Sequence, residues 1–319
     1  MSINNILKPI IAAFLLLIST MGFAQQESQY TQFMYNQLYL NPAYAGARDM
    51  ASLTALYRNQ WIGFEGSPES KLLSFNTPLL GKRVGFGLTI SNHTIGLMNS
   101  WYGSMAYSYK LQITDDANIR FGLQGTMRYL GLDFEDPEVE IRQPNDPSFS
   151  DEMESKYTGN FGMGIYFDYK NFFVGASVPN FFPNEITLNR VPSITDVAQE
   201  IPHYYLMTGA MFEASERVAI KPALLLKYVE NAPLDLDVNV SAIFDYRITI
   251  GASYRAGGDG AGDSVDLLAM YQYRNIALGL AYDFGLSELS NQTSGSFEAL
   301  LRYDFFKEQD DIANPRFFY

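Results

Sequence analysis

Residues 234–244 alternate between apolar and polar side chains with a period of two. The even positions are Leu, Leu, Val, Val, Ala and Phe, and the odd positions are Asp, Asp, Asn, Ser and Ile. Only a β-strand sends successive side chains to opposite faces, so one face meets an apolar medium and the other meets water. The fold of the chain therefore depends on whether that medium is a protein core or a lipid bilayer.

The same alternation recurs in about fourteen segments, and no amphipathic helical stripe competes with it. We expect strands near 53–57, 73–77, 84–90, 101–111, 119–129, 157–169, 172–178, 204–212, 218–228, 234–244, 248–254, 265–273, 276–284 and 297–305. Pro222 lies within one of these segments, and because proline lacks an N–H we expect a β-bulge there. The pattern predicts an all-β protein.

The connections between these segments alternate in length along the chain. Tight connections fall at 78–82, 114–117, 170–171, 214–216, 246–247 and 274–275, and long ones fall at 133–155, 179–202, 256–263 and 285–296. Outer-membrane barrels show this asymmetry, with short periplasmic turns and longer outer loops. An even number of strands also returns both ends of the barrel to the periplasmic side.

Further features favour lipid as the apolar medium. Several predicted strands reach ten or more residues, whereas strands of globular proteins have about 5–6. Aromatic residues such as Trp101, Tyr109, Tyr157 and Tyr169 lie near the ends of the apolar faces, as in an aromatic girdle. A closed sheet leaves no unpaired edge in the membrane. We therefore predict a transmembrane antiparallel β-barrel of about 14 strands, located in the outer membrane and surrounded by its lipid.

The ends of the chain differ from the predicted barrel at 51–306. Residues 1–24 have the pattern of a signal peptide, with Lys8, an apolar run at 10–18 and a small-x-small site at 22–24, so the mature chain would begin at Gln25. Residues 25–50 lack a clean period, and we expect an irregular segment in the periplasm or the lumen. Residues 307–319 form a predicted periplasmic tail.

Composition and motifs argue against several activities. The chain has no Cys, which excludes disulfides and thiol nucleophiles, and a net charge of −13, which argues against nucleic-acid binding. It has two His residues, His93 and His203, and no G-x-S-x-G motif. We predict that it is not an enzyme and that it needs no cofactor.

Charged residues occupy two other kinds of position. The polar faces carry Arg83, Arg120, Arg128, Lys221, Asp235, Asp237, Glu298, Arg302 and Asp304. These could line a pore or form an ion-pair network that closes it, and we favour the network. The acidic loop at 133–155 contains Asp133, Glu135, Asp136 and Glu138, which could bind Ca²⁺ or simply face solvent, since their spacing matches no EF-hand.

Three segments resemble a known family. They are QYTQFMYNQLYLNPAYAG at 29–46, YRNQWIGFEGSP at 57–68 and NPRFFY at 314–319. They resemble the PorP/SprF family of outer-membrane proteins of the type IX secretion and gliding-motility system. The resemblance implies a role in export and in surface anchoring of large adhesins through their C-terminal domains. Periplasmic and lipoprotein components of the system are the implied partners.

Candidate docking residues follow from loop position and aromatic character. They are Trp61 and Phe64 in the first outer loop, Phe181 and Phe182 in the proline-rich loop at 179–202, and Arg316, Phe317 and Phe318 in the tail. The loop at 179–202 could equally act as a simple lid. The alternative function is a solute porin or a transporter of hydrophobic substrates.

Overall fold

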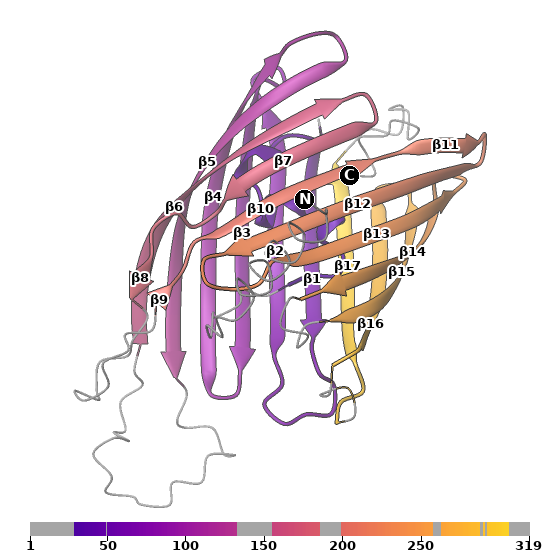
Figure 1. Ribbon diagram of the computed structural model, residues 1–319. Helices are drawn as coiled ribbons and strands as arrows, with labels where there is room; N and C mark the ends of the chain where they lie inside the picture. Colours follow the sequence, from indigo (N-terminus) through magenta and orange to yellow (C-terminus); the bar gives the residue numbers. More distant parts are fainter. Residues whose placement is uncertain are drawn as a thin grey trace, which may run out of the picture.

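The computed structural model describes residues 29–48, 50–132, 155–185, 199–257, 263–287, 290 and 292–305. Its strands form one large antiparallel sheet that closes on itself (Figure 1). The wall strands are β1 (Ala51–Asn59), β2 (Glu69–Leu79), β3 (Val84–Ile95), β4 (Met98–Gln112), β5 (Ala117–Leu132), β6 (Ser155–Tyr169), β7 (Phe172–Val178), β10 (His203–Ala210), β11 (Phe212–Ser215), β12 (Val218–Val229), β13 (Asp235–Phe244), β14 (Ile248–Ala256), β15 (Ser264–Tyr273), β16 (Ile276–Gly285) and β17 (Ser296–Phe305). Two short strands, β8 (Asn184–Glu185) and β9 (Gln199–Glu200), pair separately.

The paired strands form one complete ring. β1 pairs with β17, and β10 pairs with both β7 and β12. β10 and β11 lie along the same side of β12 and occupy one position in the wall. The barrel therefore has 14 strand positions, which confirms the predicted architecture.

The predicted bulge at Pro222 is wrong in its location. β12 keeps its register with β13 through the pair Pro222 and Val240. The strand on the other side of β12 is interrupted at Met211, which separates β10 from β11, and its register shifts between Glu213 and Ser215. Because proline cannot donate a ladder hydrogen bond, the break falls in the neighbouring strand and leaves β12 continuous.

Exposure along a single strand shows which side faces lipid. On β5 the side chains of Leu123 and Met127 are 63% and 64% exposed, whereas Arg120 and Gln124 are 2% and 4% exposed. Apolar residues thus point outward and polar residues point inward, the reverse of a water-soluble barrel. Among the described residues, no helix is long and apolar enough to cross a membrane.

The two ends of the barrel differ as the sequence predicts. At one end the hairpin turns are tight, and non-glycine residues there adopt positive φ, as at Asp245 and Tyr246 (φ 47° and 53°). Two successive residues with positive φ form the turn that suits the twist of a two-residue hairpin. The strand ends that the long connections join lie at the opposite end (Figure 1). We assign the tight end to the periplasm and the other end to the cell surface.

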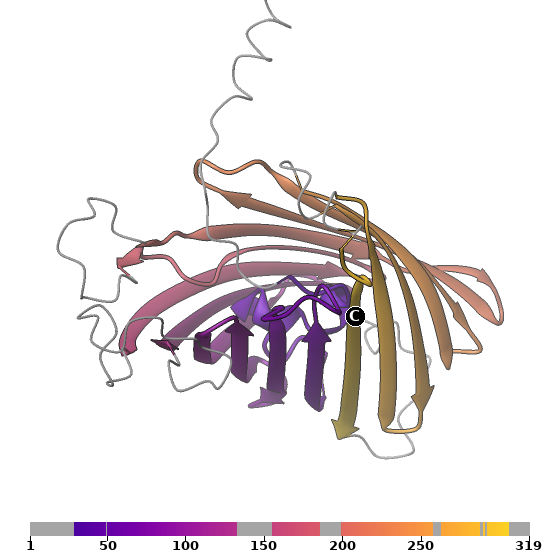
Figure 2. The ribbon, with the colours of Figure 1, turned by 90° about the horizontal axis from the view of Figure 1, so that it is seen from below.

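Residues 29–48 fill the barrel lumen, and we call them the plug (Figure 2). The plug forms three 3-10 turns, η1 (Phe33–Tyr35), η2 (Gln37–Tyr39) and η3 (Pro42–Tyr44). Asn41 starts η3 because its side-chain oxygen accepts a hydrogen bond from the Ala43 N–H at 2.9 Å, and Pro42 supplies a preset φ. Short turns of this kind let polar and apolar side chains leave the backbone in all directions.

The plug runs through the lumen from the outer mouth towards the periplasmic end. Gln29 donates to Asp235 at the outer end of β13, whereas Arg48 pairs with Asp304 near the periplasmic end of β17. Gln29 therefore lies near the outer mouth, although strand parity alone places the chain ahead of β1 on the periplasmic side.

Lumen-facing glycines make room for the plug backbone. A Cβ atom at Gly85 would lie 2.0 Å from the carbonyl oxygen of Ala45, and one at Gly122 would lie 2.1 Å from the nitrogen of Ala43. Both distances are far below any real van der Waals contact, and the obstructing atoms belong to backbone that cannot move aside alone. These positions require glycine because another chain segment passes against the wall.

We predict that Gly122→Ala destabilises the barrel by about 1–3 kcal/mol, the usual cost of overpacking. Gly125 lies on the lipid-facing side of the same strand, and a Cβ atom added there would have no other atom within 4 Å. Gly125→Ala is therefore the matched control and should change stability by less than about 0.5 kcal/mol. Urea unfolding in lipid vesicles measures both, and equal midpoints for the two variants would contradict close plug packing.

Candidate functional site

The outer half of the plug is held by a carboxylate on β17. Glu298 accepts hydrogen bonds from the backbone N–H groups of Thr31 and Gln32, both at 2.9 Å. The Thr31 hydroxyl donates to Asp283 on β16 at 2.7 Å. Two wall strands thus satisfy the polar groups at the start of the plug.

Arg58 on β1 joins these groups into one network. Its guanidinium lies 2.6 Å from Asp283 and 3.3 Å from Glu298, and it donates to the Thr31 hydroxyl at 3.0 Å. The Arg58 and Glu298 side chains are 4% and 0% exposed. Buried charges of this kind are stable only when each is paired and hydrogen-bonded, so the plug and three wall strands depend on one another.

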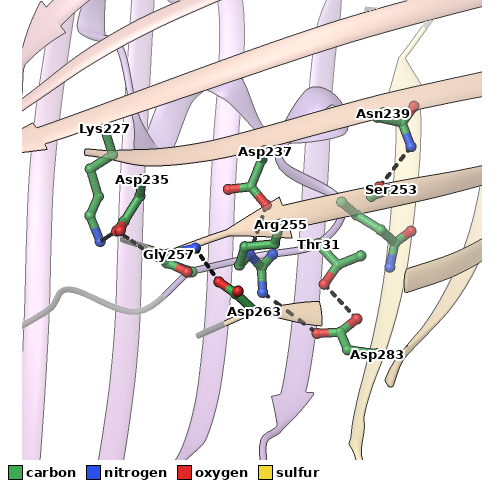
Figure 3. Close-up of polar contacts among 12 residues, drawn as sticks. Thr31, Lys227, Asp235, Asp237, Asn239, Ser253, Arg255, Gly257, Asp263 and Asp283 are labelled. Carbon is green, nitrogen blue, oxygen red and sulfur yellow. Dashed lines mark hydrogen bonds and ion pairs between the residues drawn. The ribbon is translucent and has the colours of Figure 1, made fainter. Parts of the chain in front are cut away.

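A second set of polar contacts extends across the neighbouring strands (Figure 3). Arg255 on β14 lies 2.7 Å from Asp237 on β13 and 3.8 Å from Asp283. Lys227 on β12 pairs with Asp235 on β13 at 2.7 Å. The carboxylate of Asp235 also accepts the hydrogen bond from Gln29 at 2.9 Å, which ties this set to the plug.

The periplasmic half of the plug has its own ion pairs. Arg48 donates two hydrogen bonds to Asp304, at 2.6 Å and 3.2 Å, and Arg302 donates to the same carboxylate at 3.2 Å. On β12, the Lys221 ammonium lies 4.4 Å from the ring centre of Tyr35, a cation–π contact. The end of the plug, like its start, is therefore fixed to the wall by charge.

Neutral contacts fill the space between these two ends. The amide of Asn41 donates to the carbonyl of Ile165 at 3.0 Å, and Ser177 donates to the carbonyl of Leu40 at 2.7 Å. The Tyr44 ring packs edge-on against Tyr166, with ring centres 5.6 Å apart. The plug thus makes specific contacts along the whole of its described length.

The lumen-facing charges predicted from the sequence form a network. Arg120 pairs with Asp168, and Arg128 pairs with Glu200 at 2.9 Å. Arg83 is the exception, because it lies exposed in the turn between β2 and β3 and so was wrongly assigned to the lumen. A hollow beside the plug, lined by Tyr30 and Tyr205, measures about 20 Å³, which is room for a single water molecule.

The outer mouth carries the predicted docking residues in two separate groups. Phe64 in the loop between β1 and β2 is 49% exposed, and Trp61 in the same loop has a φ of 57°, a conformation that costs energy for a bulky residue. Phe181 and Phe182, at 43% and 52% exposed, form an edge-on pair after β7. Because β1 and β7 are separated by five strands in the sheet order, the structure does not bring the two groups together.

Other predicted site residues lie outside the described residues. These are Asp133, Glu135, Asp136 and Glu138 of the acidic loop and Arg316, Phe317 and Phe318 of the tail. Within the part of the chain that the structure describes, no group of three or more His, Asp or Glu side chains could hold a metal ion.

Both histidines take part in local hydrogen bonding. His93 lies 2.9 Å from the Ser70 hydroxyl and 3.0 Å from the Ser91 hydroxyl, and His203 lies 2.9 Å from the carbonyl of Ile201. Ser70 and Ser91 are 5% and 1% exposed. A catalytic serine must be reachable by its substrate. Because Ser70 and Ser91 are buried, their hydrogen bonds with His93 are structural.

Sequence reasoning missed the plug contacts because it left residues 29–48 unplaced. Thr31, Asp283 and Arg58 were not singled out as one group, although Glu298 and Asp304 were assigned to the lumen. The resemblance block at 29–46 and the glycines on the polar faces were the available signals. Only the register of the strands shows that the residues of this block and the glycines of the wall lie against each other.

The fold and the closed lumen define a class: an outer-membrane β-barrel filled by its own N-terminal segment. The family model of the type IX secretion system membrane protein PorP/SprF matches residues 22–303. The chain therefore belongs to the PorP/SprF family and is an outer-membrane barrel of the type IX secretion system. Family and fold together suggest a non-enzymatic membrane protein.

Solved structures with similar folds include two monoaromatic hydrocarbon channels. The CymD monoaromatic hydrocarbon channel has a TM-score of 0.50 at 12% identity, covering 91% of this chain and 97% of that one. A TodX deltaS2S3 mutant monoaromatic hydrocarbon channel has a TM-score of 0.48 at 13% identity, covering 84% and 93%. A FadL homologue of Pseudomonas aeruginosa has 0.45 at 12% identity, covering 86% and 94%. At 12% identity the likeness to the CymD channel shows the fold alone. No curated protein sequence matches the chain significantly.

We predict that Glu298→Ala loosens the plug and costs about 3–5 kcal/mol, since it leaves the buried Arg58 without one partner and two plug N–H groups without an acceptor. Hydrogen exchange of the amides of residues 31 and 32, together with urea unfolding, measures this. Glu216→Ala, in an exposed turn, is the control and should stay within about 0.5 kcal/mol of wild type. Unchanged exchange at residues 31 and 32 in Glu298→Ala would contradict the assigned contacts.

Proposed function

We propose that this barrel assists the export of large adhesins and anchors them at the cell surface through their C-terminal domains. It would act with periplasmic and lipoprotein components of the type IX secretion system. The observation that carries the proposal is the filled lumen: residues 29–48 occupy the space that a channel would leave open. A plugged barrel is suited to holding a partner at its rim, and poorly suited to passing a solute.

The outer mouth supports a docking role. Exposed aromatic side chains are enriched where proteins bind partners, because they bury a large apolar area with little loss of side-chain entropy. Phe64 and Trp61 lie on one side of the mouth, and Phe181 and Phe182 lie on the other. Two separated groups fit a client domain that rests across the closed barrel.

The remaining predicted residues complete this proposal. We assign Arg316, Phe317 and Phe318 to contacts with periplasmic components, because strand β17 ends at the periplasmic side of the barrel. Asp133, Glu135, Asp136 and Glu138 are proposed Ca²⁺ ligands in the loop that follows β5, at the surface end. Both assignments rest on the position of the adjoining strands.

The second candidate is a solute porin or a transporter of hydrophobic substrates. It requires the plug to leave the lumen or to open a passage beside it. The paired charges at both ends of the plug oppose that movement, since each broken pair would leave a buried charge uncompensated. The anchoring proposal needs no such movement.

We expect the double variant Trp61→Ala and Phe64→Ala to bind an exported adhesin C-terminal domain about thirtyfold more weakly, corresponding to the loss of about 2 kcal/mol typical of an aromatic hot spot. Affinity purification of the full chain from native membranes, followed by titration of the purified domain, measures this. Leu80→Ala is the control, because Leu80 is 80% exposed at the periplasmic end. Equal affinity for both variants and wild type would exclude this side of the mouth as the docking site.

We also expect no solute passage through the intact barrel. In planar lipid bilayers the wild-type chain should show no conductance steps, and deletion of residues 29–48 should produce them. Resistance of the unheated deletion variant to unfolding in detergent gels verifies that its barrel has formed. Wild-type conductance equal to that of the deletion variant would favour the porin instead.

A further inference from the structure

The lipid-facing wall contains a groove that the plug and the outer mouth do not explain. It has a volume of about 510 Å³ and crosses β4, β3, β2, β1, β17 and β16. Its floor is formed by Ala55 on β1 and Ala299 on β17, and its sides include Leu73, Ile90 and Leu301. The volume lies within the range of pockets that hold one small molecule. We call this feature the lipid groove.

Small residues at lipid-facing positions create the groove. Ala55 lies opposite Leu73 on one neighbouring strand and Leu301 on the other. Both leucines are about half exposed, at 45% and 51%, so they stand above the alanine floor. The hollow is thus a consequence of side-chain size on a regular, paired sheet.

The surface end of the groove has polar and aromatic residues. Tyr57, Lys71, Asn92 and Trp101 follow one another across β1, β2, β3 and β4, each opposite the next. Trp and Tyr commonly lie at the level of lipid head groups in outer-membrane barrels. This row therefore marks the outer interface, and the apolar part of the groove lies within the hydrocarbon layer.

Lys71 places a positive charge at that interface. Its side chain is 59% exposed, and its ion pair with Glu69 is 3.4 Å long. An exposed ion pair of this kind contributes little free energy, so the ammonium can also engage an anionic head group. Among the residues that line the groove, Lys71 is the one with a charge.

We propose that the lipid groove binds one acyl chain of a phosphorylated lipid of the outer leaflet, with the lipid phosphate at Lys71. The outer-membrane location already surrounds this wall with lipid. The alanine floor adds a shape that fits a chain, and Lys71 adds charge complementarity for a phosphate. The membrane depth of the groove also fits an acyl chain, because an acyl chain that starts at the outer interface enters the apolar part of the groove directly.

The test uses the full chain reconstituted with diphosphorylated lipid A and then stripped with detergent before native mass spectrometry. Wild type should retain one lipid A molecule per chain. Ala55→Phe and Ala299→Phe fill the floor and should abolish retention. Ala252→Phe is the matched control, because Ala252 is an exposed, lipid-facing residue of β14 outside the groove, and it should retain the lipid as wild type does.

Lys71→Gln tests the charge without changing the floor. We expect it to weaken retention about fivefold, which corresponds to the ~1 kcal/mol that one Lys contributes near anionic lipid. Lipid A lacking both phosphates should bind wild type and Lys71→Gln equally weakly. Resistance of each variant to unfolding in unheated detergent gels verifies that the barrel is intact.

Three outcomes would overturn the proposal. The first is equal retention of lipid A by wild type and both groove-filling variants. The second is equal retention of phosphorylated and unphosphorylated lipid A by wild type. The third is a dimer of the chain that Ala55→Phe dissociates, which would assign the groove to a second copy instead.

Discussion

The structure depends on the pairing of buried charges between the barrel wall and the plug. A barrel in lipid must turn its polar residues inward, and in this chain those residues include Arg58, Glu298, Asp304 and Arg302. Each would be costly if it were buried alone. The backbone N–H groups of residues 31 and 32 and the guanidinium of Arg48 supply the partners. The plug therefore supplies partners for Glu298 and Asp304, while Arg302 is satisfied by Asp304 and Gln272 within the wall.

Most of the barrel could be predicted because one physical rule acts on every strand. Side chains on a membrane barrel alternate between lipid and lumen, so strand positions, their number and the outward-facing residues follow from a period of two. The connections add independent information, because their lengths alternate along the chain as they do in outer-membrane barrels. These local signals require no knowledge of which strands are neighbours.

The plug contacts could not be predicted in the same way. Residues 29–48 form short 3-10 turns and contact the wall on all sides, so no single period appears in their sequence. The glycines at 85 and 122 look like ordinary small lumen residues until the register places them against Ala45 and Ala43. Arg83 shows the reverse problem, because its parity fits the lumen but its position in a turn exposes it. Pro222 shows a related problem. The sequence indicates a break in the strand that contains the proline, β12, but the break lies between β10 and β11 in the neighbouring strand.

The size of the barrel explains why a plug is present at all. In barrels of about 8 strands the wall side chains alone fill the interior, whereas barrels of 16–18 strands leave a water-filled channel. A barrel with 14 strand positions lies between these limits, so its wall side chains leave a space that must hold either water or another chain segment. Here the rings of Phe33 and Tyr44 and the side chains of Met34 and Leu38 occupy that space and are 1–3% exposed. Their burial gives the lumen an apolar core inside a polar shell, which adds hydrophobic stabilisation that a water-filled pore would lack. A closed lumen is thus favoured both by the charges on the wall and by the apolar residues of the plug.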